Sequence, residues 1–216
     1  MISNEQVVLE KVGRYGNVSI GPEGGTVANH EIDLRLVMRH WRHAFAVLGE
    51  YPSLQFFDGW GEPVHEIRTL ESSDLVEFGK ITAEFASPQQ RQEWVGEGRP
   101  ATVGARPDGD VEREQLHAQW SGLQDTHDFV RLLQKLSLDR HQALRLIGTE
   151  FANEVSNVAA KRTLLGAAAA TMPILVFAGN AGCLQIHTGS VTNILPEGHL
   201  LNIRIPPSEL DFVRTE

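Results

Sequence analysis

Cysteine, basic charge and long apolar runs are all scarce in this chain. Cys183 is the only cysteine, so an intrachain disulfide is excluded and a reducing compartment is favoured. Nineteen Lys and Arg against 28 Asp and Glu give a formal net charge of −9, which argues against a general nucleic-acid surface. The longest apolar run, 164–179, is broken by Thr171 and Pro173 and is shorter than a membrane span. The opening MISNEQVVLE shows no basic segment before an apolar core, so we expect no signal peptide. These absences predict a cytoplasmic protein with no nucleic-acid partner and no membrane insertion.

Familiar catalytic and metal signatures are also missing. The sequence contains no HExxH, paired CxxC or GxSxG. The glycine-rich Gly179–Gly182 lies between two strand-like runs, whereas a phosphate-binding loop is followed by a helix. His40 and His43 are three residues apart in a strand-like HWRH segment, which places them on opposite faces and disfavours a shared metal. We interpret His187 as a hydrogen-bonded sheet histidine and Cys183 as a buried, inert thiol.

Strand-like runs occur at both ends of the chain. Ile174–Ala178 and Cys183–Ile186 flank a Gly/Asn loop, which is typical of a β-hairpin. Leu54–Phe57 and Val64–Ile67 flank a second glycine-containing loop in the same way. Ile32–Leu36 alternates apolar and charged residues, as a half-buried strand does.

Helix signals fill the middle of the chain. Ser73 is a candidate N-cap for a helix with apolar residues at three- and four-residue steps that Pro88 ends. Residues 88–110 are polar and rich in Gly, Pro and Gln, and indicate a linker. Four helices are predicted beyond it: 112–123, one capped by Asp125 or Thr126, one capped by Asp139, and 155–170.

Together these signals predict an α+β fold. We expect antiparallel β-sheets built from hairpins, with a helical cluster packed to one side. The predicted segments are a β-rich part ending in a helix (1–87), a linker (88–110), and a helical cluster followed by β-hairpins (111–216).

A faint internal repeat relates the two ends. Val8–Gly13 followed by Asn17-Val18 resembles Gln185–Gly189 followed by Asn193-Ile194, and both Gly13–Gly189 and Asn17–Asn193 are separated by 176 positions. A constant offset indicates one structural unit used twice. We therefore expect two related half-repeats joined by the linker.

Four blocks of sequence carry a resemblance to a known family. They are IDLRLVMRHWRHAFAV (32–47), SLQFFDGWGEPVHEI (53–67), LQDTHDF (123–129) and VFAGNAGCLQIHTG (176–189). The chain resembles the HemS/ChuS-type haem utilisation proteins, bacterial cytosolic haem carriers of which some degrade haem. The resemblance implies that the chain spans the end of one family repeat and the start of the next.

His127 is the first candidate for binding haem. It follows Asp125 in the first turn of a predicted helix, and neutral imidazole is a good iron ligand. From the residues alone, a solvent-facing histidine beside a helix cap is the commoner outcome. The resemblance implies the axial-ligand role, because the family's axial histidine falls in this DTHxF setting.

Three further residues gain a role from the resemblance. It places Arg35 on the opposite haem face, where a guanidinium bonds a distal water, bound oxygen or a propionate; the alternative is a solvated edge-strand arginine. Val37 stands where family members often carry an aromatic residue against the porphyrin, so ring stacking is lost there. Phe177 matches a phenylalanine that packs by the haem, although by itself it is typical of a plain core residue.

The resemblance implies an intracellular haem-binding protein of iron acquisition, with haem b as its cofactor. Carriage of haem is the first hypothesis, and haem degradation is left open. A haem-donating transporter or a haem oxygenase would then be a partner, and a homodimer is a further expectation. The alternatives are a truncated family remnant that oligomerises without binding haem, because cut sheets expose strand edges, and a plain interaction module with an acidic surface.

Overall fold

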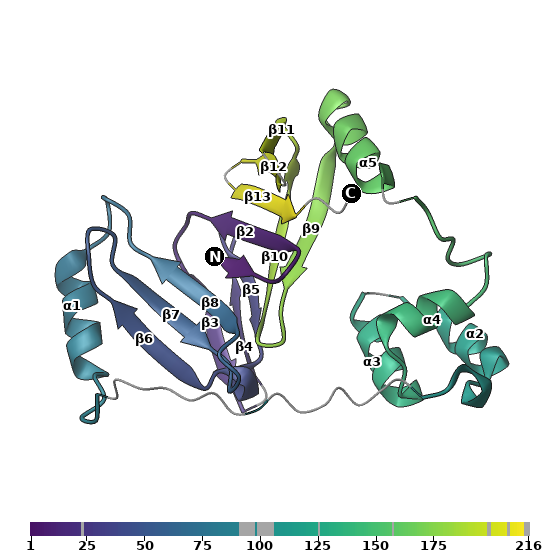
Figure 1. Cartoon of the computed structure of the whole chain (residues 1–216), viewed down its shortest axis with the longest axis horizontal. Coiled ribbons are helices and arrows are strands. Elements are labelled where there is room, and N and C mark those ends of the chain that lie inside the picture. Colours follow the sequence, from purple (N-terminus) through teal and green to yellow (C-terminus); the bar gives the residue numbers. More distant parts are fainter. Residues whose placement is uncertain are drawn as a thin grey trace. The chain divides into compact units, whose positions relative to one another are not determined.

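The chain forms two compact units (Figure 1), seen in a computed structural model that describes residues 1–22, 24–90, 98, 106–124, 126–156, 158–197, 200–206 and 208–213. Unit 1 combines Met1–Arg99 with Asn157–Glu216, and unit 2 is Pro100–Ser156. The predicted segments 1–87, 88–110 and 111–216 divide the chain at other places. The difference arises because strands near the two ends of the chain pair with each other.

Unit 1 contains the β-sheets. Its strands are β1 (Ile2–Ser3), β2 (Val7–Lys11), β3 (Val18–Gly21), β4 (Gly24–Ala28), β5 (Asp33–Leu36), β6 (His43–Val47), β7 (Ser53–Phe57), β8 (Pro63–Arg68), β9 (Pro173–Gly179), β10 (Cys183–Ser190), β11 (Asn193–Glu197), β12 (Leu200–Ile205) and β13 (Ser208–Val213). Its helices are α1 (Leu75–Glu84), α5 (Val158–Ala169) and a 3₁₀ turn, η1 (Met38–His40).

Unit 2 is helical. It comprises η2 (Asp108–Asp110), α2 (Arg113–Ser121), α3 (Thr126–Leu136) and α4 (Arg140–Leu146). Its core gathers apolar side chains from these helices, led by the fully buried Leu116 and Ala143. The predicted Asp139 cap is confirmed, because its carboxylate accepts a hydrogen bond from the Gln142 backbone N–H at 2.8 Å. The proposed Asp125 cap lies outside the described residues.

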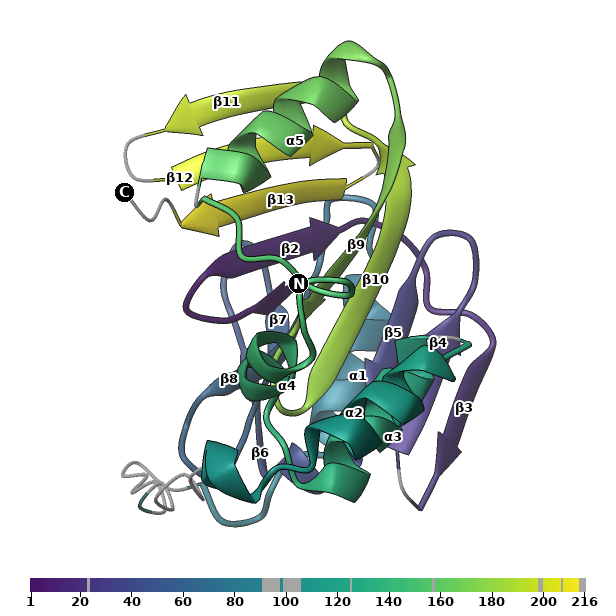
Figure 2. The ribbon, with the colours of Figure 1, turned by 90° about the vertical axis from the view of Figure 1, so that its right-hand side faces the viewer.

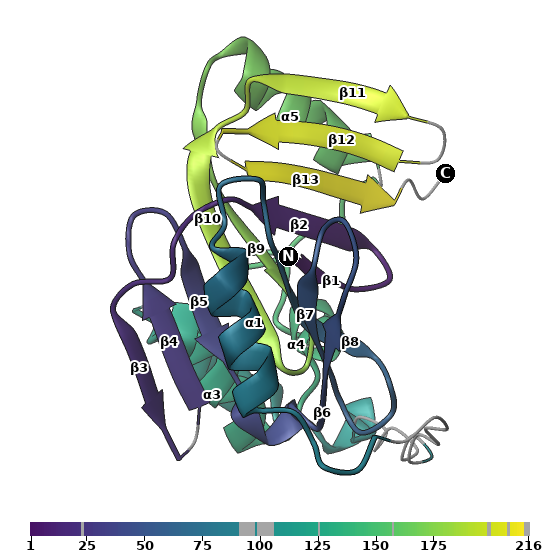
Figure 3. The ribbon, with the colours of Figure 1, turned by 90° about the vertical axis from the view of Figure 1, so that its left-hand side faces the viewer.

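The described strands form three antiparallel sheets (Figure 3). Two have five strands, in the orders β1-β2-β13-β12-β11 and β3-β4-β5-β10-β9, and the third is β6-β7-β8. The predicted hairpins correspond to β9–β10 and β7–β8. The α+β class with antiparallel hairpins is therefore confirmed.

Strand register extends the repeat seen in the sequence. An offset of 176 carries β2, β3, β4 and β5 onto β10, β11, β12 and β13. It also carries the pair Asp33–Ile186 onto the pair Glu209–Glu10, so the two five-stranded sheets share one register. Each five-stranded sheet takes strands from both half-repeats, which explains why unit 1 closes around a single core.

That core lies behind the five-stranded sheets. Leu9, Leu34, Ile203 and Ile205 are almost fully buried in it. Helix α5 packs against β11 (Figure 2), and its Ala167 joins the same cluster. Among the described residues, no helix is long and apolar enough to cross a membrane.

Two local predictions are corrected by the structure. Asp74 caps α1 in place of Ser73, since its carboxylate accepts from the backbone N–H groups of Val76 and Glu77, both at 3.0 Å. The HWRH segment is not one strand, because η1 ends at His40 and β6 begins at His43. The intervening Trp41 turns inward and donates its indole N–H to the Gly182 carbonyl at 2.8 Å.

Candidate functional site

Register places Arg35 and Phe177 on the same face of one sheet. Arg35 of β5 is paired with Leu184 of β10, and Ile186 of β10 is paired with Phe177 of β9. Paired residues point the same way, and residues two apart on a strand share a face. Arg35, Phe177, Leu184 and Ile186 therefore lie on one face, which we call the Arg35 face. The alternate residues of β10, among them Cys183, point into the core.

The Arg35 face carries apolar side chains in the open. Phe177 is 46% exposed and Leu175, on the same face of β9, is 54% exposed. The interpretation of Phe177 as a plain core residue is therefore wrong, because its strand turns the neighbouring Ala178 inward instead. An exposed aromatic ring beside aliphatic neighbours is typical of a ligand or partner surface.

Arg35 is the cation of this face. Its guanidinium pairs with the carboxylate of Asp33 and donates to the Leu34 carbonyl at 3.1 Å. Because β5 lies between β4 and β10, Arg35 is not on an edge strand and that alternative is wrong. The side chain is 33% exposed, so a guanidinium held by a neighbouring carboxylate remains within reach of a ligand.

Val37 lies where the sheet meets the β9–β10 hairpin. It is half-buried, and its backbone N–H donates to the Gly182 carbonyl at 2.9 Å. Asn180 fixes this hairpin end, because its side-chain oxygen accepts from Gly182 and Cys183 N–H, both at 3.0 Å. Its amide also donates to the Val64 carbonyl at 2.9 Å. Val37 thus lies on a rigid turn at the end of the strand that bears Arg35.

His127 belongs to the other unit. It is the second residue of α3, and the placement of its side chain lies outside what the structure describes. Among the described residues, no group of three or more His, Cys, Asp or Glu forms a metal site. The ligand role of His127 therefore stays a prediction.

The repeat supplies an internal comparison for the Arg35 face. At the offset of 176, Arg35 corresponds to Asp211, Ile186 to Glu10, and Asp33 to Glu209. The acidic character of Asp33 is kept in Glu209, and the apolar Leu184 corresponds to Val8, whereas Arg35 and Ile186 correspond to acidic residues. The two faces thus differ at the positions of Arg35 and Ile186.

A polar cluster around the buried His65 was not predicted from the sequence. The Tyr15 hydroxyl lies 2.5 Å from His65 Nε2, and Cys183 Sγ lies 4.0 Å from His65 Nδ1. Burial lowers the pKa of His65 to about 3 and raises the pKa of Cys183 to about 12. The prediction that Cys183 is a buried thiol is thus confirmed. The prediction that His187 is a hydrogen-bonded sheet histidine is also confirmed, because its Nε2 lies 3.0 Å from the Ile205 carbonyl oxygen. Nothing in the local pattern around Tyr15 or His65 indicated their contact.

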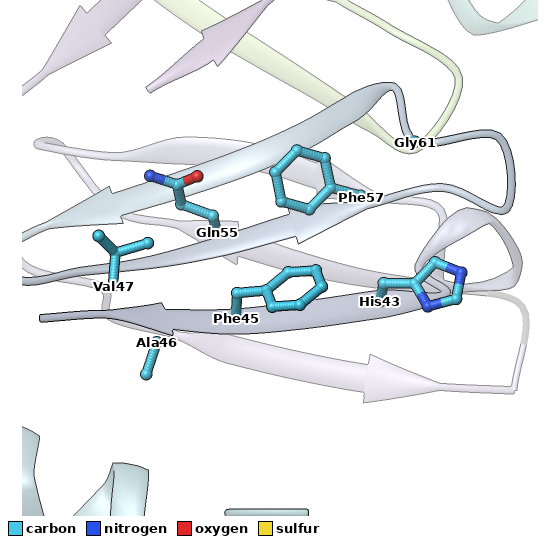
Figure 4. Close-up of a pocket in the computed structure, with 7 residues that line it drawn as sticks. All are labelled: His43, Phe45, Ala46, Val47, Gln55, Phe57 and Gly61. Atoms are coloured by element: carbon cyan, nitrogen blue, oxygen red, sulfur yellow. The ribbon is translucent and has the colours of Figure 1, made fainter. Parts of the chain in front are cut away.

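An apolar cavity of about 360 Å³ lies on strands β6 and β7 (Figure 4). The rings of Phe45 and Phe57 meet edge to face there, with centroids 5.8 Å apart. It contains none of the predicted haem-site residues; its lining is His43, Phe45, Ala46, Val47, Gln55, Phe57 and Gly61. The Arg35 face, rather than this cavity, therefore carries the predicted residues of unit 1.

Comparison with known proteins defines the class. The family described as the haemin-degrading HemS/ChuX domain matches residues 1–85 and 137–212. The chain belongs to this family. The matched residues include Arg35, Val37 and Phe177, whereas His127 lies between the two matched stretches.

Individual relatives share the fold along almost the whole chain. Apo-PhuS, described as a haem-binding protein from Pseudomonas aeruginosa, is 33% identical with a TM-score of 0.92. ChuS, a haem-degrading enzyme of Escherichia coli O157:H7, is 29% identical with a TM-score of 0.85. The match covers 98% of this chain and 63% of PhuS or 62% of ChuS. The hemin transport protein HemS of Yersinia enterocolitica is 30% identical over 93% of this chain and 59% of its own length. The chain thus spans about three fifths of the relatives it matches.

Proposed function

We propose that this chain binds haem b as cargo in haem uptake for iron acquisition. The observation that carries the proposal is the Arg35 face, on which a guanidinium lies among open apolar side chains. Family membership supports it, since PhuS is described as haem-binding and HemS as a hemin transport protein.

The residues of the Arg35 face fit a porphyrin chemically. Haem is a flat apolar ring with two carboxylates at one edge, and it requires apolar contact area and a cation. Phe177, Leu184 and Ile186 offer the contact area, and Arg35 offers a planar donor for a carboxylate or an iron-bound ligand. Val37 adds aliphatic contact without ring stacking.

His127 is the proposed axial ligand. Its neutral imidazole suits ferric or ferrous iron, and its place at the start of α3 matches the family's DTHxF setting. We propose the two roles separately: His127 holds the iron, and Arg35 with Phe177 contacts the porphyrin.

Haem degradation is a second candidate activity. It is favoured by ChuS, which is described as a haem-degrading enzyme. Haem iron itself supplies oxygen activation when bound, and the role of this chain's residues would be to hold the ring and exclude water from it. A haem-donating transporter or a haem oxygenase, both acting in the cytoplasm, would be the partner. Exposed apolar residues such as Phe45, 47% exposed, support a homodimer as part of the proposal.

Hemin titration tests the proposal. The wild-type chain should give a saturable Soret shift. Arg35→Ala should weaken hemin binding several-fold, because a charge-assisted hydrogen bond is lost. Arg68→Ala is the matched control, since Arg68 pairs with Glu66 on the third sheet and its loss should leave binding unchanged. Equal binding by wild type and Arg35→Ala would contradict the role of Arg35. An oligomer indifferent to hemin would instead support the truncated-remnant alternative.

A further inference from the structure

A polar contact in unit 1 pairs the phenol of Tyr15, which is 41% exposed, with the buried imidazole of His65. Tyr15 lies in the loop between β2 and β3, and His65 lies on β8. The phenol oxygen is 2.5 Å from His65 Nε2, and the His65 side chain is only 4% exposed. The Trp41 ring lies 6.0 Å from the His65 ring. The pair is thus a short hydrogen bond inside an aromatic cluster.

The proposed proton acceptor is Nε2 of His65. Nε2 faces the Tyr15 hydroxyl at 2.5 Å, and Nδ1 lies 4.0 Å from Cys183 Sγ. In the tautomer that carries its proton on Nδ1, Nε2 accepts the hydrogen bond of the phenol. Because burial keeps the pKa of His65 low and raises the pKa of Tyr15, a protonated phenol faces a neutral imidazole at neutral pH.

The cluster lies behind the Arg35 face. Cys183, which is 4.0 Å from His65, points into the core, while its neighbour Leu184 points onto the Arg35 face. One β-sheet therefore separates Tyr15 and His65 from the surface that we propose to hold haem. All of these residues belong to unit 1.

We propose that Tyr15 is a redox-active tyrosine that uses His65 as its proton acceptor. A one-electron oxidant removes an electron from the phenol, and the hydroxyl proton moves to His65 Nε2. The products are a neutral tyrosyl radical, an imidazolium and the reduced oxidant. Return of one electron and the proton restores the phenol and the neutral imidazole. The biological oxidant is haem iron oxidised by a peroxide, and this assignment alone rests on the proposed function.

Two features make the transfer favourable. Oxidation of a phenol makes its proton strongly acidic, so a base in contact with the hydroxyl lowers the barrier to electron loss. The phenol oxygen and Nε2 are 2.5 Å apart, a distance over which a proton moves readily. The neutral state of His65 leaves that base available across the neutral pH range. A tyrosine in this setting would carry oxidising equivalents away from a reactive haem.

The chain contains two tyrosines, Tyr15 and Tyr51, which provides a matched control. Tyr51 is 58% exposed. The chain without haem is oxidised by photogenerated tris(bipyridine)ruthenium(III) and freeze-quenched for electron paramagnetic resonance. We expect the tyrosyl signal in the wild type and in Tyr51→Phe, and its loss in Tyr15→Phe.

The proton acceptor is tested by His65→Gln. A glutamine keeps a hydrogen-bond acceptor for Tyr15 but takes up no proton, so the rate of radical formation should fall roughly tenfold or more. A signal that disappears in Tyr51→Phe and survives in Tyr15→Phe overturns the proposal without any His65 variant. An unchanged rate in folded His65→Gln also overturns it. Since no haem is present, the result is independent of whether the chain binds hemin.

Discussion

The buried imidazole of His65 makes the stability of unit 1 depend on pH. Its pKa is lowered from 6.5 to about 3, first by burial and then by the nearby amino group of Met1. The unfolded chain therefore binds one more proton than the folded chain between these pH values. The contribution is complete above pH 6.5 and decreases as the pH falls, by about 1.4 kcal/mol for each pH unit. Between pH 6.5 and 5 the free energy of unfolding should fall by about 2 kcal/mol from this residue.

Urea unfolding at several pH values measures the effect, with His65→Gln as the reference. Glutamine retains a partner for the Tyr15 hydroxyl and does not titrate. His187, whose pKa burial also lowers, contributes in the same direction in both proteins and cancels in the comparison. The wild type should lose about 2 kcal/mol more than His65→Gln between pH 6.5 and 5. Parallel pH profiles for the two proteins would refute the burial of a neutral His65.

Other predictions follow from the hairpin and the thiol. Asn180→Ala should lower the free energy of unfolding by about 2–4 kcal/mol, because its side chain bonds two backbone N–H groups and carbonyls of two other segments. The control is Asn153→Ala, which loses one exposed hydrogen bond to the Thr149 carbonyl. It should lower the free energy of unfolding in urea by less than about 1 kcal/mol. Equal losses in the two variants would contradict the role of Asn180 in fixing the hairpin end. Cys183, 1% exposed with its pKa raised to about 12, should react with a maleimide only on unfolding. Stoichiometric labelling of the folded chain would contradict its burial.

The local sequence pattern predicted which segments form strands better than it predicted which strands pair with each other. The hairpins β7–β8 and β9–β10 are readable because each joins neighbouring runs through a glycine loop. The pairing of β5 with β10 joins residues about 150 positions apart, and nothing local specifies it. The offset between Gly13 and Gly189 indicated a repeat. It did not indicate that strands of the two half-repeats would pair within the same sheets.

In the candidate site, too, some features follow from local sequence and others only from strand pairing. Alternation within β5 predicts that Arg35 and Leu34 point to opposite faces. Only the cross-strand register places Phe177 on the face of Arg35, and therefore exposes a ring that sequence alone assigns to the core. The contact between Tyr15 and His65 spans 50 positions and leaves no periodic trace. The one-residue difference between Ser73 and Asp74 as the cap of α1 reflects two adjacent residues of equal capping ability.

The most direct test of the central claim is the Soret spectrum of the hemin-loaded chain with and without His127. Wild type and His117→Ala, a control histidine of α2 that pairs with Glu150, should give the same histidine-ligated spectrum and affinity. His127→Ala should shift the Soret band and weaken hemin binding at least tenfold. An unchanged spectrum and affinity in His127→Ala would contradict the account.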